Sequence, residues 1–436
     1  MFTLLLVTLL GLLVGVIIGL FSVFPVYFAG FIIYAFHGIW TPELLLVFWS
    51  VAAIGSQFFG SVSTICLGIP GEASSLVYIK DVQNMSLAER NVLLYQTAKG
   101  SLFAGAVALI VVWVGYHHLV YYSYMLTGIK FTLGVFLIVV SMFALTDRRP
   151  VIAILLLLFG ILLGPNNNYA LPTWWYTIQQ LFEKTSFFLL IAGLMIIPDA
   201  MFNRLNGKVN RAIHYEANSA DSSKTWWTII KSTAVGIFAG SIPGPSAETA
   251  AALAYHTHKK QGKFHQIVAA ETANNPGAVM MLLPFFIMGV PITSSALIIS
   301  NVLDIKNVDI QSFISNSSNY LIDYTVFDAI IFVSLIATVF YFFLSTRFID
   351  VYVSLVEKIY GKSRWLLFVM VSGMILIDMT FNETTVSNYL ALLVAFTGIG
   401  LCLRYFKANP ILLIFGIMFG DKLIWTLLQF YTIYFG

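Results

Sequence analysis

Long apolar runs separated by short polar stretches dominate this sequence and restrict what it can fold into. Each run approaches the roughly 20 apolar residues that a helix needs to cross the hydrocarbon of a bilayer. The composition agrees, since 59% of the residues are hydrophobic and 10% are charged, which is more apolar surface than a water-soluble globule can hide. The candidate spans are residues 2–20, 43–66, 98–116, 131–146, 150–164, 186–202, 226–241, 266–287, 325–345, 365–379, 386–403 and 410–434.

Backbone hydrogen bonding decides how these runs fold. Lipid offers no partner for backbone N–H and C=O groups, so only helices and closed barrels span it. The runs lack the alternation of apolar and polar residues that barrel strands show. We therefore predict an all-α polytopic membrane protein with about 10–12 membrane segments. The first run has no basic residue before it and no cleavage site after it, which indicates a retained helix instead of a signal peptide.

A helix-breaking motif occurs twice in the chain. LGIPGEASSL at 67–76 returns as MGVPITSSAL at 288–297, and VGVIIG at 14–19 returns as VGIFAG at 235–240. Both pairs share an offset of 221 positions, and the matched Gly and Pro are uncommon in this chain. Internal duplication of this kind is common in secondary transporters. The two predicted transmembrane repeats are residues 1–221 and 222–436.

Basic residues in equivalent loops predict that the two repeats have opposite orientations. The first loop carries Lys80, Arg90 and Lys99, whereas its counterpart in the second repeat carries only Lys306. Lysine and arginine mark cytoplasmic loops, so equivalent loops should lie on opposite sides of the membrane. We therefore predict an inverted-topology repeat with re-entrant or paired hairpins, broken helices and a pocket near the bilayer midplane.

Another pair of similar segments does not share this offset. FGILLG at 159–164 resembles FGIMFG at 415–420. Because the two do not occupy equivalent positions of the repeats, we interpret their similarity as coincidence.

The Pro-Gly interruptions are the predicted binding elements. A broken helix frees backbone groups inside the membrane, and a bound ion or substrate can satisfy them. Helix N-terminal ends suit a carboxylate, whereas unwound carbonyls and Ser, Thr or Asn oxygens suit sodium. Such residues also serve as packing devices in membrane helices. The predicted substrate-binding residues are Ser61, Pro70, Gly71, Glu72, Ser74, Ser75, Asn275, Pro291, Thr293, Ser294 and Ser295. The predicted ion-binding residues are Gly244, Ser246, Glu248 and Asn274.

Three carboxylates near these motifs have two possible roles, ion binding or helix capping. Glu72, Glu248 and Glu271 could each hold a proton or cation, because a carboxylate within the hydrocarbon is costly and is normally functional or paired. Each could equally cap a helix end that faces water. No arginine lies within the motifs, so backbone and hydroxyl donors would hold a substrate carboxylate.

Several ordered motifs resemble one known family. GSVSTICLG followed by IPGEASSLV, and GSIPGPSAETAAALAY followed by ETANNPGAVMMLLPFFIMGVP, look like the large membrane subunit of the tripartite tricarboxylate transporters. The resemblance covers residues 14–117 and 226–300. The chain departs from the family's usual Leu-Pro-Gly hairpin tip at Gly19–Pro25, which reads GLFSVFP. The second hairpin, around Gly244, is therefore the stronger ligand candidate.

The resemblance implies a function, a location and partners. It implies a secondary active transporter, an ion-coupled symporter that imports a small carboxylate such as a tri- or dicarboxylate, with sodium or a proton as the coupling ion. A periplasmic solute-binding protein would deliver the substrate, and a small membrane subunit would accompany the chain in the bacterial cytoplasmic (inner) membrane. No cofactor and no other metal are expected, and a homodimer is left open.

The residues leave two alternative functions, a passive channel and an intramembrane enzyme, and they give no sign of nucleic-acid binding. A passive anion channel would share hairpins and repeats with a carrier. An intramembrane enzyme is less favoured, because His256 and His258 do not share a helix face and no HExxH pattern occurs. The net charge of +3 forms no concentrated patch for nucleic acid. Cys66 and Cys402 lie in apolar segments and are interpreted as packing residues.

Overall fold

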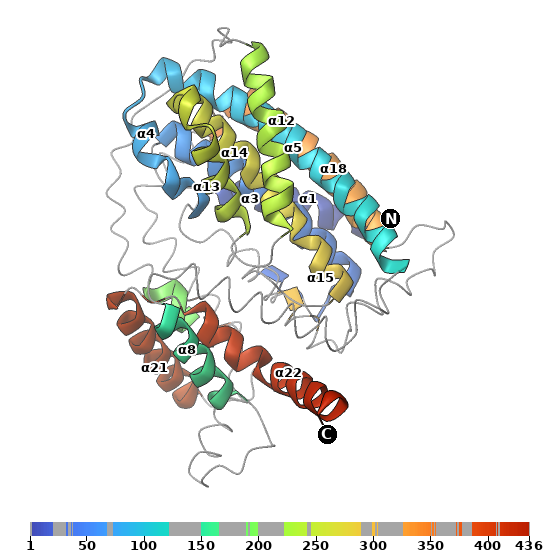
Figure 1. Cartoon of the computed structure of the whole chain (residues 1–436), viewed down its shortest axis with the longest axis vertical. Coiled ribbons are helices and arrows are strands. Elements are labelled where there is room, and N and C mark those ends of the chain that lie inside the picture. The colour runs from blue at the N-terminus through green and yellow to red at the C-terminus, as the bar shows by residue number, and fades with distance from the viewer. Residues whose placement is uncertain are drawn as a thin grey trace. The chain divides into compact units, whose positions relative to one another are not determined.

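The computed structural model is helical throughout the residues that it describes, and no strand occurs among them (Figure 1). These residues divide into two compact units. Unit 1 comprises Met1–Tyr121, Leu205–Ile242 and Ser246–Ser363, and unit 2 comprises Tyr122–Arg204, Pro243–Pro245 and Arg364–Gly436. The described residues are 2–20, 32–33, 36, 38–67, 73–121, 150–164, 189–190, 192–198, 222–241, 246–288, 299–300, 303, 326–349, 351–352, 354, 372, 375–376, 386–406, 408 and 410–435.

Several helix bounds follow the predicted apolar runs closely, but α5 begins at Leu87, 11 residues before the predicted run 98–116. The described helices of unit 1 are α1 (Phe2–Leu20), α3 (Pro42–Leu67), η1 (Ala73–Val77), α4 (Ile79–Gln83), α5 (Leu87–Tyr121), α12 (Ser222–Gly240), α13 (Ser246–Thr257), η3 (Lys259–Gln261), α14 (Lys263–Met280), α15 (Leu282–Met288) and α18 (Val326–Arg347). Those of unit 2 are α8 (Pro150–Leu163), the π-helical turn η2 (Ala192–Ile196), α21 (Val386–Tyr405) and α22 (Ile411–Tyr434). The predicted spans 131–146 and 365–379 lie almost wholly outside the described residues.

Four of the described helices are long and apolar enough to cross a membrane. They are Pro42–Cys66, Ala88–His118, Val326–Arg347 and Val386–Tyr405. This finding supports the prediction of an all-helical membrane protein.

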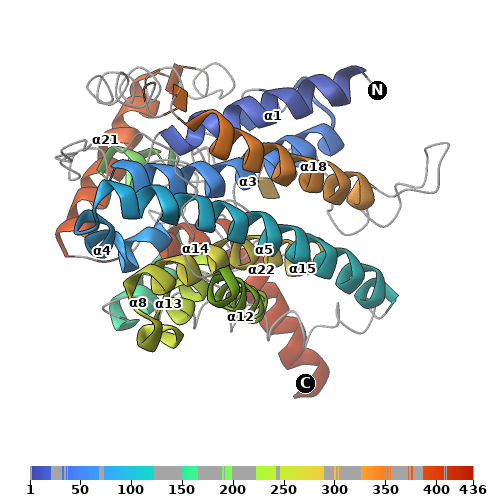
Figure 2. The same ribbon diagram turned by 90° about the horizontal axis from the view of Figure 1, so that it is seen from above.

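Helices α1, α3 and α18 pack tightly through two glycines. A Cβ atom placed on Gly15 would lie 3.0 Å from the Cα of Gly55, so the backbones of α1 and α3 are nearly in contact. The hydroxyl of Tyr341, from α18, fills this crossing and lies 3.1–3.2 Å from the carbonyl oxygens of Gly11, Leu12 and Val51. Figure 2 shows α1, α3 and α18 side by side, with α5 next to them. Close backbone approach at small residues is typical of membrane helices.

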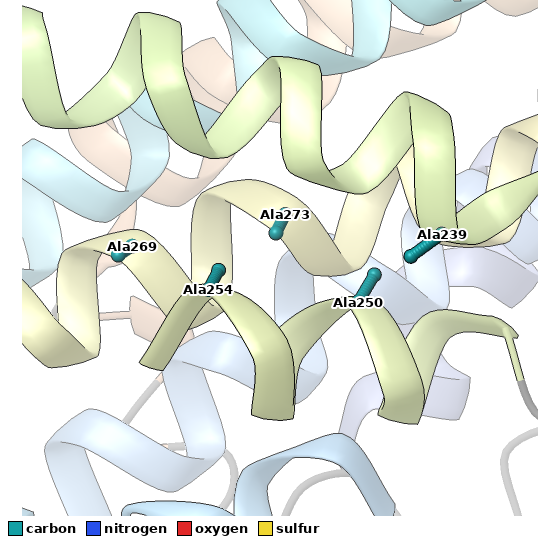
Figure 3. Packing of buried hydrophobic residues seen from close by; sticks show 5 residues of the cluster. All are labelled: Ala239, Ala250, Ala254, Ala269 and Ala273. Carbon is teal, nitrogen blue, oxygen red and sulfur yellow. The ribbon is translucent and has the colours of Figure 1, made fainter. Parts of the chain in front are cut away.

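Helices α12, α13 and α14 form a second tight group. A Cβ atom on Gly236 of α12 would lie 2.6 Å from the carbonyl oxygen of Ala273 and would overlap the ring of Pro276 in α14. Small side chains also line the centre of the group, where alanines from all three helices face one another (Figure 3). They are Ala239, Ala250, Ala254, Ala269 and Ala273. With no large side chain between them, the three helices pack at close range.

The close contacts in the two helix groups occupy equivalent positions of the two sequence copies. The contact of Gly15 with Gly55 and that of Gly236 with Pro276 each join residues 40 positions apart in the chain. The second contact is also the first one displaced by 221 positions. Displaced by the same offset, α1 coincides with α12 to within one residue, and α3 coincides with α14 and α15 together.

Helices α3 and α14–α15 run antiparallel to each other. Three side-chain contacts show it, because residue numbers rise along α3 while they fall along its partner. Ser61 contacts Glu271, Gln57 contacts Asn274, and the ring of Trp49 meets that of Phe285 with centroids 5.7 Å apart.

Unit 2 contains the crossing of α8 and α22. A Cβ atom on Gly160 would lie 3.0 Å from the Cα of Gly416, and one on Gly164 would lie 2.8 Å from the carbonyl oxygen of Ile417. The segments FGILLG and FGIMFG, whose similarity we interpreted as coincidence, therefore meet at one interface. Their shared glycine spacing has a packing role, since small residues allow the helices to approach.

Candidate functional site

Helix α14 carries an unusual run of buried polar side chains. Glu271, Thr272, Asn274 and Asn275 are each at most 3% exposed. Helices α3, α5, α12 and α13 all pack against α14, so no face of its central part is left open. Buried polar and charged groups are costly unless they are hydrogen-bonded, and in a membrane they mark functional sites by default.

Three hydrogen bonds connect this run to α3 and α5. The Ser61 hydroxyl of α3 donates to the Glu271 carboxylate. The amide nitrogen of Asn274 donates to the side-chain oxygen of Gln57, also in α3, at 2.7 Å. From the same face of α14, the amide nitrogen of Asn275 donates to the hydroxyl of Ser101 in α5 at 2.6 Å. The resulting set of Gln57, Ser61, Ser101, Glu271, Asn274 and Asn275 is called the polar seam below.

Pro276 adds a free backbone acceptor next to the polar seam. A proline inside a helix has no N–H to bond the carbonyl four residues earlier, which here belongs to Thr272. The hydroxyl of Thr272 is also buried and has no hydrogen-bond partner among the described residues. This hydroxyl lies against Gly100 of α5, where any larger residue would collide with it. The seam therefore offers one carboxylate and several neutral oxygens, which is the ligand chemistry of sodium.

A cavity of about 70 Å³ lies beside the polar seam. Helices α1, α3, α5, α14 and α18, with Met281 and Leu282 beyond α14, line it mainly with apolar side chains. Gln57 and Asn275 of the polar seam also face this cavity. Its volume is sufficient for several water molecules, since the centre of one water molecule needs about 10–15 Å³ of such space.

The structure brings together three of the predicted site residues. Ser61, Asn274 and Asn275 all belong to the polar seam. Ser74 and Ser75 are buried in η1, which packs against α13 and α14. Glu248, in the first turn of α13, is partly exposed. Ser246 begins α13, although its side chain lies outside the described set. Also outside the described residues are Pro70, Gly71, Glu72, Gly244, Pro291, Thr293, Ser294 and Ser295.

Other members of the polar seam were missed as site residues. Gln57 and Ser101 received no role from the sequence, and Glu271 was weighed but not chosen. The available signal was polarity at helical spacing, since Gln57 and Ser61 lie four residues apart in a long membrane-spanning candidate helix. Arg90 was also misjudged as a loop residue. It lies in the first turn of α5 and is 3% exposed.

A separate ion pair joins the first and second halves of the chain at the start of α14. The Lys263 ammonium donates to the Tyr255 hydroxyl at 2.8 Å and to the Asp81 carboxylate at 3.1 Å. Tyr255 also donates to Asp81. The hydrogen bonds with Tyr255 and Asp81 raise the pKa of Lys263, so the lysine stays charged at physiological pH. These contacts tie α4 to α13 and α14, although exposed pairs of this kind stabilise proteins only slightly.

Comparison with known proteins identifies the family. The family described as "Tripartite tricarboxylate transporter TctA family" matches the chain over residues 5–415. The chain belongs to the TctA family. That match confirms the resemblance predicted from the sequence motifs, and TctA is a family of transport proteins, not of enzymes.

A more distant relative adds little about function. An "Uncharacterized 52.8 kDa protein in TAR-I ttuC' 3'region" of Agrobacterium vitis is 24% identical over 307 residues. That alignment covers 65% of this chain and 59% of the relative. No solved structure matches the chain.

Proposed function

We propose that this TctA protein is an ion-coupled symporter that imports a small carboxylate, such as a tri- or dicarboxylate. A periplasmic solute-binding protein delivers the substrate, and a small membrane subunit completes the transporter in the bacterial cytoplasmic membrane. Membership of a tripartite tricarboxylate transporter family supports the substrate class and the partners. The observation that carries ion coupling is the buried Glu271 carboxylate in the polar seam.

The proposed architecture is an inverted repeat, and helix geometry supports it. Helices α3 and α14–α15 occupy equivalent positions of the two copies, since the 221-residue offset relates their bounds. Their antiparallel contacts mean that equivalent helices point in opposite directions. Opposite direction of equivalent helices is the defining property of an inverted repeat.

The division into compact units also supports two copies. Each unit contains an early and a late part of the chain, so the first and second copies contribute to both. The early parts of the copies, 1–121 and 222–342, fall in unit 1 except for Pro243–Pro245. All described residues of the polar seam lie in this unit, which makes unit 1 the proposed site of ion and substrate binding.

The proposed coupling site is centred on Glu271. A carboxylate takes either a proton or a sodium ion, and its neutral form tolerates burial better than its charged form. Ser61 and the amide groups of the seam supply neutral hydrogen-bonding atoms around it. An ion bound here would neutralise the carboxylate where α3 and α14 meet, so binding would favour one arrangement of these helices over another.

Uptake by reconstituted vesicles tests this function. Vesicles would contain the purified transporter with its small membrane subunit and would receive labelled citrate, succinate or an aromatic acid, with and without the solute-binding protein. We expect accumulation above the external concentration that requires a sodium or proton gradient. Equilibration without accumulation under every gradient would contradict a symporter and favour a passive anion channel.

Removal of one amide from the polar seam should reduce transport. Asn275→Ala deletes the donor to Ser101 and shortens a side chain that lines the cavity. A buried hydrogen bond left unmade costs about 1–3 kcal/mol. We therefore expect the initial uptake rate to fall about 10-fold. Ser345→Ala is the matched control, because this buried hydroxyl donates to Phe342 in its own helix α18. Membrane expression of both variants should equal that of the wild type. Equal uptake by the two variants would remove Asn275 from the proposed site.

A further inference from the structure

Arg90 is a buried cation near the end of α3. It lies in the first turn of α5 and is 3% exposed. One of its terminal nitrogens, Nη2, donates to the carbonyl oxygen of Gln83 at the end of α4, at 3.0 Å. This bond has a structural use, because it joins α4 to α5. It occupies only one of the five N–H groups that a guanidinium carries.

The two remaining nitrogens of Arg90 have no partner in the part of the chain that the structure describes. Nε and Nη1 are buried and have no hydrogen-bond partner among the described residues. Within the same residues, the ion pairs join His117 to Asp328 and Lys263 to Asp81, and neither involves Arg90. Arginine stays charged in proteins, and a buried charge is costly unless it is paired and hydrogen-bonded. A buried guanidinium whose Nε–H and Nη1–H groups point in different directions and remain unused is suited to donate charge-assisted hydrogen bonds to separate anionic oxygens.

Arg90 lies near the C-terminal end of α3, which precedes the first Pro-Gly motif in sequence. It lies close enough to Cys66 for an electrostatic interaction, and Cys66 is the second-last residue of α3. The motif residues 68–72 follow α3 directly in sequence. A second buried donor without a described partner, the Tyr78 hydroxyl, lies between η1 and α4 in the segment that follows the motif.

We propose that Arg90 binds carboxylate oxygens of the transported substrate through Nε and Nη1. The inference deepens the proposed function and rests on it for the chemical class of the anion. It also replaces the expectation that backbone and hydroxyl donors alone hold the substrate. Arg90 supplies the positive charge that a multiply charged acid needs.

Anion binding by the purified transporter tests Arg90 without requiring transport. The melting temperature of the detergent-purified protein would be measured with increasing citrate, tricarballylate and the monoamide of tricarballylate. We expect Arg90→Gln to weaken the apparent affinity for citrate about 10-fold or more, because charge-assisted hydrogen bonds are among the strongest polar contacts. Lys99→Gln is the matched control, since it removes one positive charge from the same helix and its ammonium lies over the ring of Tyr95. This control should bind as the wild type does.

The amide analogue separates direct contact from a structural role. Loss of one carboxylate should weaken binding to the wild type but weaken binding to Arg90→Gln much less. Equal losses in both proteins would overturn the proposal. If Arg90→Gln does not fold, Arg90→Lys serves as the test variant because it keeps the positive charge. Its affinity for citrate should be lower than that of the wild type. Wild-type affinity in Arg90→Lys would overturn the two-nitrogen contact.

Two further outcomes are decisive. If Glu72→Gln and Arg90→Gln lower the melting temperature equally, and the double variant is no worse, Glu72 is the partner of Arg90 and the proposal is wrong. Failure of the wild type to bind any of the acids would also overturn it. Binding that depends on Arg90, combined with no gradient-driven uptake in vesicles, would instead contradict only the symporter function.

Discussion

Glu271→Gln is expected to abolish concentrative uptake while leaving the protein folded. The substitution keeps the size and the hydrogen bonding of the side chain but removes the negative charge that a proton or sodium ion would neutralise. Loss of a coupling free energy of about 1–3 kcal/mol corresponds to a fall in accumulation of about 5–150-fold. The measurement is steady-state accumulation of labelled citrate in vesicles with an imposed sodium or proton gradient.

Exchange of substrate distinguishes lost coupling from general damage. A carrier without its coupling site should still exchange internal for external substrate, so counterflow by Glu271→Gln should remain near the wild-type rate. Thermal stability should not fall, because a buried neutral amide avoids the desolvation penalty of a buried carboxylate. Glu43→Gln, in the first turn of α3, is the control and should accumulate substrate normally. Full accumulation by Glu271→Gln would exclude this carboxylate as the coupling site.

Gly236→Ala is expected to destabilise the protein strongly although alanine favours helices. The added Cβ atom would lie 2.6 Å from the carbonyl oxygen of Ala273 and would overlap the ring of Pro276. A backbone carbonyl and a proline ring cannot move aside as a flexible side chain would, so α12 and α14 must separate. Overpacking of this kind costs about 1–3 kcal/mol, which exceeds the gain of up to about 1 kcal/mol in helix propensity.

The apparent melting temperature in detergent measures this effect. We expect Gly236→Ala to lower it by several degrees, as about 1–3 kcal/mol implies for a domain of about 150–250 residues. Gly105→Ala in α5 is the matched control, because a Cβ atom there would make only an ordinary 3.4 Å contact with Thr338. The control should be as stable as the wild type or slightly more stable. A Gly236→Ala protein with wild-type stability would show that α12 and α14 are not in backbone contact.

Several helices were predictable because long apolar runs mark them in the sequence. Residues 2–20 became α1 with the same bounds, and the runs at 386–403 and 410–434 became α21 and α22 to within two residues. The offset of 221 positions, visible in shared Gly and Pro, also matches the bounds of α1 with α12. These features depend on local sequence and on spacing, which a single chain displays.

The polar seam was harder to predict because it depends on which helices meet. Ser61 and Glu271 are 210 positions apart, and their contact follows from the antiparallel packing of α3 and α14. Sequence alone placed Ser61, Asn274 and Asn275 in candidate sites, but it gave no reason to join Gln57 or Ser101 to them. Arg90 was assigned to a loop because basic residues near a span usually lie outside the membrane, whereas α5 begins at Leu87 and buries the arginine.

The two glycine crossings have a consequence for how the transporter moves. Helices held backbone to backbone cannot slide past one another without collision, so α1 with α3, and α12 with α14, should each travel as a rigid block. In the proposed transport mechanism, a rearrangement of these four helices would then occur between the blocks. The hydrogen bonds of Ser61 with Glu271 and of Gln57 with Asn274 cross that boundary. A cation bound there would stabilise the contact between the blocks, and its release would allow the blocks to separate.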